Sequence, residues 1–248
     1  MALYDKIGLK YADLRRPDAR IAARIKAALG DAKSVLNVGA GAGAYEPPDR
    51  QITAVEPSAE MIEQRPPSTA RVVRGRAEDL PFGDDSFDAA MALLTIHHWS
   101  NKPKGVAEMR RVARGQIVFL TYDPAFRGFW LFDYFPELVA LDEGQMPGLG
   151  EFEDWLGEIT ISSVAIPEDC TDGFLAAYWQ RPEAYLDERV RAAMSSFWAL
   201  GDISDGLARL EHDLQSGVWE RRHGALRDLT ELDCGYRLVE APRSAPPP

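Results

Sequence analysis

The residues with the clearest chemical potential form a glycine-rich run that directly follows an apolar stretch. The run extends from Val35 to Gly43 and reads VLNVGAGAG. Glycine at every second position lets the backbone adopt positive φ angles and approach a ligand without an intervening Cβ. Because open α/β sheets bind ligands at the carboxyl ends of their strands, the run predicts a ligand site after a first parallel strand.

A carboxylate follows the next apolar stretch in the same way. Residues 52–58 read ITAVEPS, and Glu56 lies 17 residues after Gly39. A carboxylate at this place can accept two hydrogen bonds from the vicinal hydroxyls of a ribose. Gly39, Gly41 and Ala44 also fit the dinucleotide pattern G-x-G-x-x-G/A. These two segments indicate a nucleoside cofactor, and they leave a nicotinamide dinucleotide open beside other nucleosides.

A third segment runs from Gly75 to Asp88 (GRAEDLPFGDDSFD), and the sequence TIHHW follows at residues 95–99. Taken in order with the first two, this segment closely resembles the class I S-adenosylmethionine-dependent methyltransferases. The small-molecule subgroup of methyltransferase type 11 is the most similar. The resemblance covers about Tyr4 to Thr121. It is specific in combination, since nicotinamide dehydrogenases do not carry the second and third segments together. It implies S-adenosylmethionine as the cofactor.

The resemblance also implies a role for each matching residue. The glycines would line the methionine part of the cofactor, Glu56 would hold both ribose hydroxyls, and the Ala77 backbone N–H would meet the adenine. The implied cofactor residues are Gly39, Gly41, Gly43, Glu56, Pro57, Met61, Ala77, Glu78, Leu94 and Ile96. Relatives often carry an acid or asparagine just before that alanine, whereas this chain has Arg76.

The N-terminal segment would fold across the cofactor as a lid, as it does in relatives. The Tyr11 ring over a sulfonium would gain cation–π energy, and Arg16 would pair with the cofactor's carboxylate. Surface packing of an amphipathic helix is the alternative for both residues.

His97 and His98 are the candidates for a general base. They follow the fourth expected strand, and a histidine titrates near neutral pH, which suits proton removal. We prefer His98 of the two. A structural role for the pair, with one ring capping the next helix, is the alternative.

The second half of the chain is rich in aromatic residues, with 17 from Tyr122 onward against seven before it. Ligand sites are mostly apolar, so we expect Tyr122, Trp130 and Tyr134 to contact the methyl acceptor. The alternative is that these rings form a core. Asp123 and Asp133 flank this segment without evident partners, so no metal site is expected.

Alternation of short apolar runs with helical patterns predicts a parallel sheet covered on both faces. The expected strands are Ser34–Val38, Ile52–Val55, Arg71–Val73, Phe87–Leu94, Gln116–Thr121, Ile159–Ile166 and Gly235–Glu240. The expected helices are Asp18–Leu29, Ser58–Gln64, Pro103–Ala113, Asp187–Leu200 and Asp205–Val218. The fold class is therefore α/β: a Rossmann-like, doubly wound, mostly parallel seven-stranded sheet with a helical insertion before the last strand.

The domain organisation follows from this pattern. We expect one methyltransferase domain over residues 1–241, followed by a disordered tail over 242–248. Within the domain, residues 1–30 form the lid and first helix, 31–121 the cofactor-binding core, and 122–234 the acceptor-side elements and helical insertion. A small independent helical domain is the alternative for the insertion.

Charge and composition exclude several classes of partner. The 248 residues carry 28 basic and 39 acidic side chains, a formal net charge of −11. That charge disfavours nucleic acids and anionic membranes as partners. No apolar run approaches the roughly 20 residues of a membrane helix, and two cysteines are too few for a disulfide framework. We therefore expect a cytoplasmic protein, and the sequence leaves its oligomeric state open.

The predicted activity is metal-independent transfer of a methyl group from S-adenosylmethionine to a small, partly apolar acceptor at O, N or C. Two alternatives remain at this point. One is an NAD(P)-dependent oxidoreductase with the same sheet, and the other is a non-catalytic S-adenosylmethionine-binding protein, because one fold hosts many functions.

Overall fold

A seven-stranded sheet forms the centre of the computed structural model, which describes residues 15–242. In spatial order its strands are β3 (Arg71–Arg74), β2 (Gln51–Glu56), β1 (Ser34–Val38), β4 (Phe87–Leu93), β5 (Ala113–Tyr122), β9 (Tyr236–Ala241) and β6 (Thr160–Ser163). The strands from β3 to β5 pair in parallel, and β9 is antiparallel to both of its neighbours. This arrangement confirms the predicted fold class.

Helices cover both faces of the sheet because successive strand residues point to opposite faces. Val35 of β1 joins one core with Ile21 and Ile25 of α3 (Ala19–Ala28). Leu36 joins the other core, which contains the buried faces of α5 (Lys102–Val112) and α7 (Leu149–Leu156). A short helix, α4 (Ala59–Glu63), follows β2.

Side-chain caps start three of these helices. The carboxylate of Asp18, the hydroxyl of Ser58 and the amide oxygen of Asn101 each accept a backbone N–H of the first turn. Such caps satisfy backbone donors that have no partner inside the helix. The predicted positions of α3, α4 and α5 are confirmed to within one or two residues at either end.

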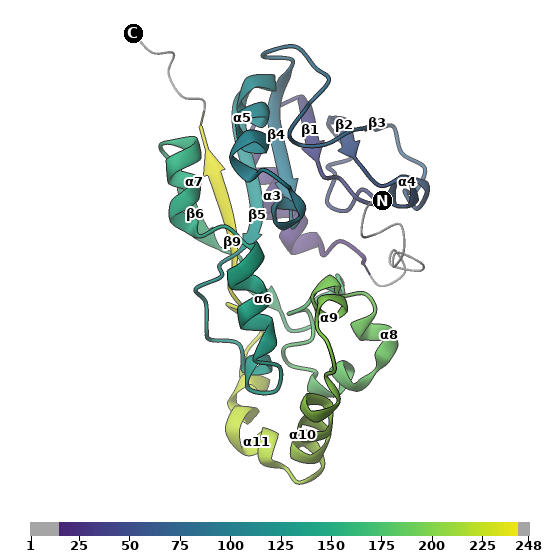
Figure 1. Ribbon diagram of the computed structural model, residues 1–248, viewed down its shortest axis with the longest axis vertical. Helices are drawn as coiled ribbons and strands as arrows, with labels where there is room; N and C mark the ends of the chain where they lie inside the picture. Colours follow the sequence, from purple (N-terminus) through teal and green to yellow (C-terminus); the bar gives the residue numbers. More distant parts are fainter. Residues whose placement is uncertain (1–14, 243–248) are drawn as a thin grey trace.

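The insertion lies beyond the carboxyl ends of the parallel strands, opposite the end where they begin (Figure 1). It contains a short antiparallel pair of strands, β7 (Ile166–Pro167) and β8 (Glu231–Leu232), and it shares its lobe with α6 (Glu137–Gln145). Its helices are α8 (Glu188–Arg191), α9 (Ser195–Ala199), α10 (Ser204–Gln215) and α11 (Val218–His223). The prediction of one helix over Asp187–Leu200 is wrong, because the structure has two separate short helices there, α8 and α9.

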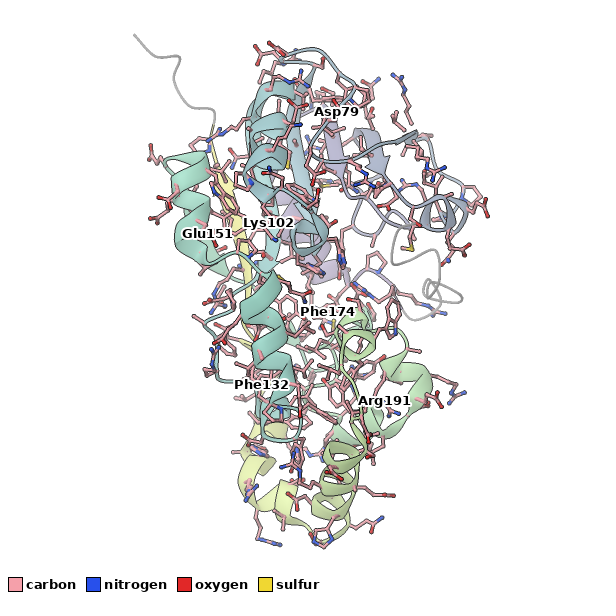
Figure 2. All side chains as sticks on the ribbon, in the orientation of Figure 1. Asp79, Lys102, Phe132, Glu151, Phe174 and Arg191 are labelled. Atoms are coloured by element: carbon pink, nitrogen blue, oxygen red, sulfur yellow. The ribbon has the colours of Figure 1, made fainter. Side chains whose placement is uncertain are left out.

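Aromatic side chains fill the space between the sheet and the insertion helices, as Figure 2 shows around Phe132 and Phe174. The 3-10 segments over Trp130–Asp133 and Pro182–Leu186 place further rings in this core. One continuous cluster joins these rings to the α3 face of the sheet, so the insertion packs on the sheet and does not form a core of its own. Within residues 15–242, no helix has the length and apolarity needed to cross a bilayer.

Candidate active site

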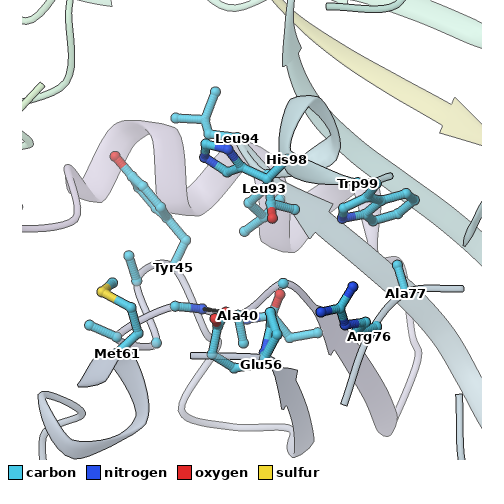
Figure 3. Close-up of a pocket in the computed structure, with 18 of the residues that line it drawn as sticks. Ala40, Tyr45, Glu56, Met61, Arg76, Ala77, Leu93, Leu94, His98 and Trp99 are labelled. Atoms are coloured by element: carbon cyan, nitrogen blue, oxygen red, sulfur yellow. Dashed lines mark hydrogen bonds between the residues drawn. The ribbon is translucent and has the colours of Figure 1, made fainter. Parts of the chain in front are cut away.

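A cavity of about 530 Å³ lies at the carboxyl ends of β1, β2 and β4 (Figure 3). Its size is typical of a site for a small molecule or cofactor. The lining residues come from Arg15 and Pro17, from Asn37 and residues 39–45, from Glu56, Pro57, Met61, Gln64 and Pro66, from residues 75–78, and from residues 93–95 and 98–100. The cavity is therefore where the sequence predicts a ligand.

The glycine-rich run forms a tight bend that only glycine can build in this form. Gly39, Gly41 and Gly43 have φ angles of 70°, 51° and 87°, and all three line the cavity. A Cβ on Gly39 would lie 2.1 Å from the Thr95 Oγ1, so a side chain there would collide with the neighbouring strand end. The bend consequently brings bare backbone against the cavity.

Glu56 ends β2 and points toward this bend. The side chain is 6% exposed, and its Oε2 accepts a hydrogen bond from the Gly41 backbone N–H at 2.8 Å, while Oε1 accepts one from the Ser58 N–H at 2.9 Å. These two donors fix the orientation of the carboxylate. A carboxylate offers about four acceptor positions, so the two backbone bonds do not by themselves saturate it.

A buried ion pair takes the place of the helix that usually follows such a bend. Residues 40–50 contain only turns and bends, and the Arg65 guanidinium bonds Glu46 Oε2 at 2.5 Å and the Gly41 carbonyl at 3.3 Å. The Asn37 amide donates to Glu46 Oε1 at 2.9 Å. The contacts of Arg65 with Glu46 were not predicted from the sequence, although Pro47-Pro48 signals that no helix continues there.

The opposite end of the cavity is lined by residues 75–78 and by Trp99. Ala77 is buried, and the exposed side chain of Arg76 lies near Trp99 (Figure 3). Glu78 Oε1 accepts hydrogen bonds from the Ser100 hydroxyl at 2.8 Å and the Asn101 N–H at 3.0 Å. Burial opposes ionisation of Glu78, but these hydrogen bonds outweigh it and lower the pKa of the carboxyl. Glu78 thus fixes the start of α5 as well as lining the cavity.

The residues after β4 divide into two groups. Leu94, in the left-handed region at φ 51°, and His98 line the cavity. Ile96, implied by the resemblance as a cofactor residue, is 1% exposed, packs in the core beneath α5 and does not line the cavity.

The two histidines stack with ring centroids 3.8 Å apart, but only His98 lines the cavity. His98 is exposed toward the cavity, but the protein that surrounds its ring and the positive charge of Lys102 lower its pKa to about 4. Burial, then His98 and Lys102, lower the pKa of His97 well below its ordinary value, and its buried Nδ1 has no hydrogen-bond partner. We therefore drop His97 as a candidate base.

The arginine that lines the cavity is the neighbour of the one that the sequence analysis assigned to the cofactor's carboxylate. Arg16 is exposed and does not line the cavity, whereas Arg15 does. The chain pairs with the insertion here through a β-bridge of Arg15 with Asp172, and this turns the Arg15 side chain inward. Tyr11 lies outside the described residues, as does the predicted tail beyond Pro242.

The three aromatic residues predicted to contact the acceptor do not line the cavity. Trp130 donates its Nε1–H to the Trp179 carbonyl at 2.8 Å and packs edge-on against Trp219. Tyr134 donates its hydroxyl to Asp213 at 2.9 Å. Tyr122 is buried against Tyr236. All three belong to the aromatic cluster between the sheet and the insertion, because β5 leads directly into the lobe and away from the glycine bend.

The described lining fits a nucleoside that carries an amino-acid chain. It joins a glycine bend, a strand-end carboxylate and a buried alanine beside Trp99 in one cavity of suitable size. Among residues 15–242, no group of three or more His, Cys, Asp or Glu side chains is arranged to hold a metal ion.

Comparison with known proteins gives sequence relatives for the first half of the chain. A family model described as a methyltransferase domain matches residues 36–120. The uncharacterized methyltransferase YcgJ of Bacillus subtilis is 35% identical over 120 residues, which is 44% of each chain. The rice protein 2-methyl-6-phytyl-1,4-hydroquinone methyltransferase 1 is 25% identical over 142 residues, 53% of this chain and 42% of the relative. The match thus spans less than half the length of these relatives.

Solved structures extend the similarity to nearly the whole chain. A protein from Anabaena variabilis, described as a methyltransferase of an antibiotic biosynthesis pathway, is 35% identical with a TM-score of 0.85. The match covers 92% of this chain and 98% of that one. Geranyl diphosphate C-methyltransferase from Streptomyces coelicolor shares the fold at 15% identity and a TM-score of 0.53, over 91% of this chain and 76% of the other.

Proposed function

Because the chain belongs to the class I S-adenosylmethionine-dependent methyltransferases, with S-adenosylmethionine as the cofactor, we propose a specific activity for it. The protein transfers the methyl group to a small, partly apolar acceptor at an O, N or C atom, without a metal ion. The comparisons favour neither a nicotinamide oxidoreductase nor a non-catalytic binding protein.

One observation carries the proposal: the Glu56 carboxylate is held against the glycine bend inside the cavity. In this arrangement Glu56 would accept both ribose hydroxyls, and the bend would receive the methionine part. Pro57, Ala77 and Glu78 line the cavity where the adenine would lie, and Met61 lines it on the side of Tyr45 and the glycine bend (Figure 3). Gly39, Gly41 and Gly43 allow the close approach because they carry no Cβ.

Orientation and exclusion of water are what this protein has to provide. When bound, the cofactor supplies a methyl group that its sulfonium already activates. Leu94 and Tyr45 line the cavity, and their apolar groups would exclude water from the reacting atoms. Holding an acceptor in line with the methyl group can contribute on the order of 7–11 kcal/mol at best.

His98 is a group in the described lining that can meet an acceptor's polar atom. With a pKa of about 4, its ring is neutral at pH 7 and accepts a hydrogen bond without carrying charge. Such a ring orients a hydroxyl or amine, but it is a weaker base than a histidine with an ordinary pKa. The proposal therefore gives His98 the role of orienting the acceptor.

The names of the sequence relatives support the acceptor class. Several plant relatives are named for 2-methyl-6-phytyl-1,4-hydroquinone, and one from Erwinia pyrifoliae, 33% identical over 100 residues, is named malonyl-[acyl-carrier protein] O-methyltransferase. Both names describe a polar, reactive head on an apolar or carrier-bound chain. An acceptor of mixed polarity fits a cavity lined by Leu94 and His98 together.

Calorimetry with S-adenosylmethionine and S-adenosylhomocysteine tests the cofactor site. We expect both to bind saturably and Glu56→Ala to weaken both by about 100-fold or more, since it removes two hydrogen bonds to a charged group, each of which contributes about 1.5–3 kcal/mol. Glu63→Ala, which removes an exposed carboxylate from the neighbouring α4, is the matched control and should leave both affinities unchanged. Unaltered binding by Glu56→Ala would show that the ribose lies elsewhere.

A further inference from the structure

Three segments that are far apart in the sequence meet at the end of the cavity beyond the glycine bend. Arg15 precedes α3, Tyr45 follows the bend, and Asp172 belongs to the insertion. Arg15 and Tyr45 line the cavity, and Asp172 lies behind them, out of its lining. This end of the cavity is thus built jointly by the N-terminal segment, the bend and the insertion.

The Asp172 carboxylate holds the other two residues. It is 0% exposed, its Oδ1 accepts from Arg15 Nε at 2.5 Å, and its Oδ2 accepts from the Tyr45 hydroxyl at 2.8 Å. Backbone hydrogen bonds link the same three segments. The Thr171 N–H donates to Asp18 Oδ2 at 3.3 Å, and the Asp18 N–H donates to the Tyr45 hydroxyl at 3.4 Å. Asp172 is therefore the centre of a buried network.

Two properties of Tyr45 make this network a constraint. Its φ angle is 63°, a conformation that a bulky residue adopts only where its surroundings impose it. Burial and the negative charge of Asp172 also raise the pKa of Tyr45. The hydroxyl therefore stays protonated and donates a hydrogen bond to the carboxylate. The ring is consequently fixed on the cavity wall by the carboxylate behind it.

The order of residues along the cavity indicates what this wall meets. Ala77 and Trp99 lie at one side, Glu56 near the middle, and Tyr45 at the opposite side (Figure 3). With the ribose at Glu56 and the adenine beside Ala77, the amino-acid end of the cofactor lies by Tyr45 and Arg15. That end is a zwitterion with no net charge, and the ion pair of Arg15 with Asp172 is likewise neutral overall.

We propose that Asp172 is a positioning residue of the cofactor site. It holds the Arg15 guanidinium and the Tyr45 ring beside the amino-acid end, so cofactor binding depends on the docking of the insertion against the N-terminal segment. This inference rests on the proposed place of the ribose at Glu56. It adds a contribution of the insertion to a site that the first half of the chain otherwise provides.

Two ligands of different length test the inference by calorimetry. S-adenosylhomocysteine has the amino-acid end, and 5′-methylthioadenosine has the same adenine, ribose and sulfur without it. Asp172→Asn should raise the Kd for S-adenosylhomocysteine by about tenfold or more, because the buried guanidinium loses its charged partner. The same variant should change the Kd for 5′-methylthioadenosine less than about twofold. A purely structural defect would weaken both ligands equally.

Two further variants complete the experiment. Asp213→Asn is the matched control, since Asp213 also accepts a tyrosine hydroxyl, that of Tyr134, away from the cavity. It should leave both ligands unaffected. If Asp172→Asn fails to fold, Tyr45→Phe, which removes only the hydroxyl, should show the same selective loss at smaller size.

The outcomes separate the inference from the proposed function. Selective loss of S-adenosylhomocysteine supports the positioning role. Wild-type affinity in Asp172→Asn and Tyr45→Phe, or equal loss of both ligands, overturns that role and leaves the proposed function intact. Failure of the wild-type protein to bind S-adenosylhomocysteine at all would overturn both.

Discussion

At the scale of single residues, the buried carboxyl of Asp142 on α6 destabilises the folded protein by an amount that depends on pH. Its side chain is 4% exposed, and burial raises its pKa to about 7 from an ordinary 3.8, with only partial opposition from Arg127. Between about pH 4 and 7 the folded protein therefore binds more protons here than the unfolded chain does. Stability contributed by this site falls as pH rises through that window.

Asp142→Asn removes this cost, because the amide has a similar shape and no charge to desolvate. We expect the gain in the free energy of unfolding to be about 1–2 kcal/mol larger at pH 8 than at pH 5.5, since one pKa unit corresponds to about 1.4 kcal/mol. Urea unfolding at the two pH values measures the difference. Asp154→Asn, at an exposed acid on α7, should show no such pH dependence. A gain for Asp142→Asn that is the same at both pH values would contradict the account.

The sequence predicts the residues of the site only where their placement is local. Gly39 and Glu56 could be found because each directly follows its own strand, and strand ends meet at one edge of a parallel sheet. Arg15 and Tyr45 could not, because both depend on Asp172, which lies 157 and 127 positions away in the sequence. Trp130 was predicted to contact the acceptor but does not line the cavity. Its residue type could not decide between the two places, since an aromatic ring fits a core as well as a pocket.

At the scale of elements, the turn-rich stretch after β1 relies on one buried ion pair. The side chains of Arg65 and Glu46 are 5% and 9% exposed, and a Cβ on Gly43 would lie 3.0 Å from the Arg65 guanidinium. Without a helix behind the bend, this pair fixes the backbone that faces the cavity. Loss of the arginine would leave the Glu46 carboxylate buried without its charged partner.

Arg65→Met keeps most of the side-chain volume and removes the charge. We expect it to lower the free energy of unfolding by about 3–5 kcal/mol and to weaken S-adenosylhomocysteine binding at least tenfold. Arg189→Met, which breaks an exposed pair with Asp187, should cost less than about 1 kcal/mol and leave binding unchanged. Urea unfolding and calorimetry give the two quantities. Equal effects of the two substitutions would show that the bend does not depend on this pair.

The elements themselves were predictable to different degrees. The buried strands carry continuous apolar runs, and the capped helices α3 and α5 carry both a cap and a periodic apolar face, so sequence and structure agree there. The insertion is different, because Asp187 caps a helix that already ends at Arg191. Its aromatic side chains satisfy helical spacing and irregular packing equally well, and tertiary contacts decide between them.

At the scale of the whole molecule, two of the contacts between the insertion and the first half of the chain involve the core and the cavity. Its aromatic side chains join the cluster on the α3 face of the sheet, and Asp172 accepts hydrogen bonds from Arg15 and Tyr45 of the cavity wall. The second half of the chain therefore helps to hold the cavity residues of the first half in place. The solved structure from Anabaena variabilis, similar over 92% of this chain, indicates that this arrangement is shared beyond the cofactor-binding half.

A crystal structure of the protein with S-adenosylhomocysteine tests the central claim most directly. The account predicts the ribose hydroxyls within hydrogen-bonding distance of the Glu56 carboxylate, the amino-acid chain over Gly39 and Gly41, and the adenine beside Ala77. A nucleoside bound elsewhere, or in this cavity with its sugar turned away from Glu56, would contradict it.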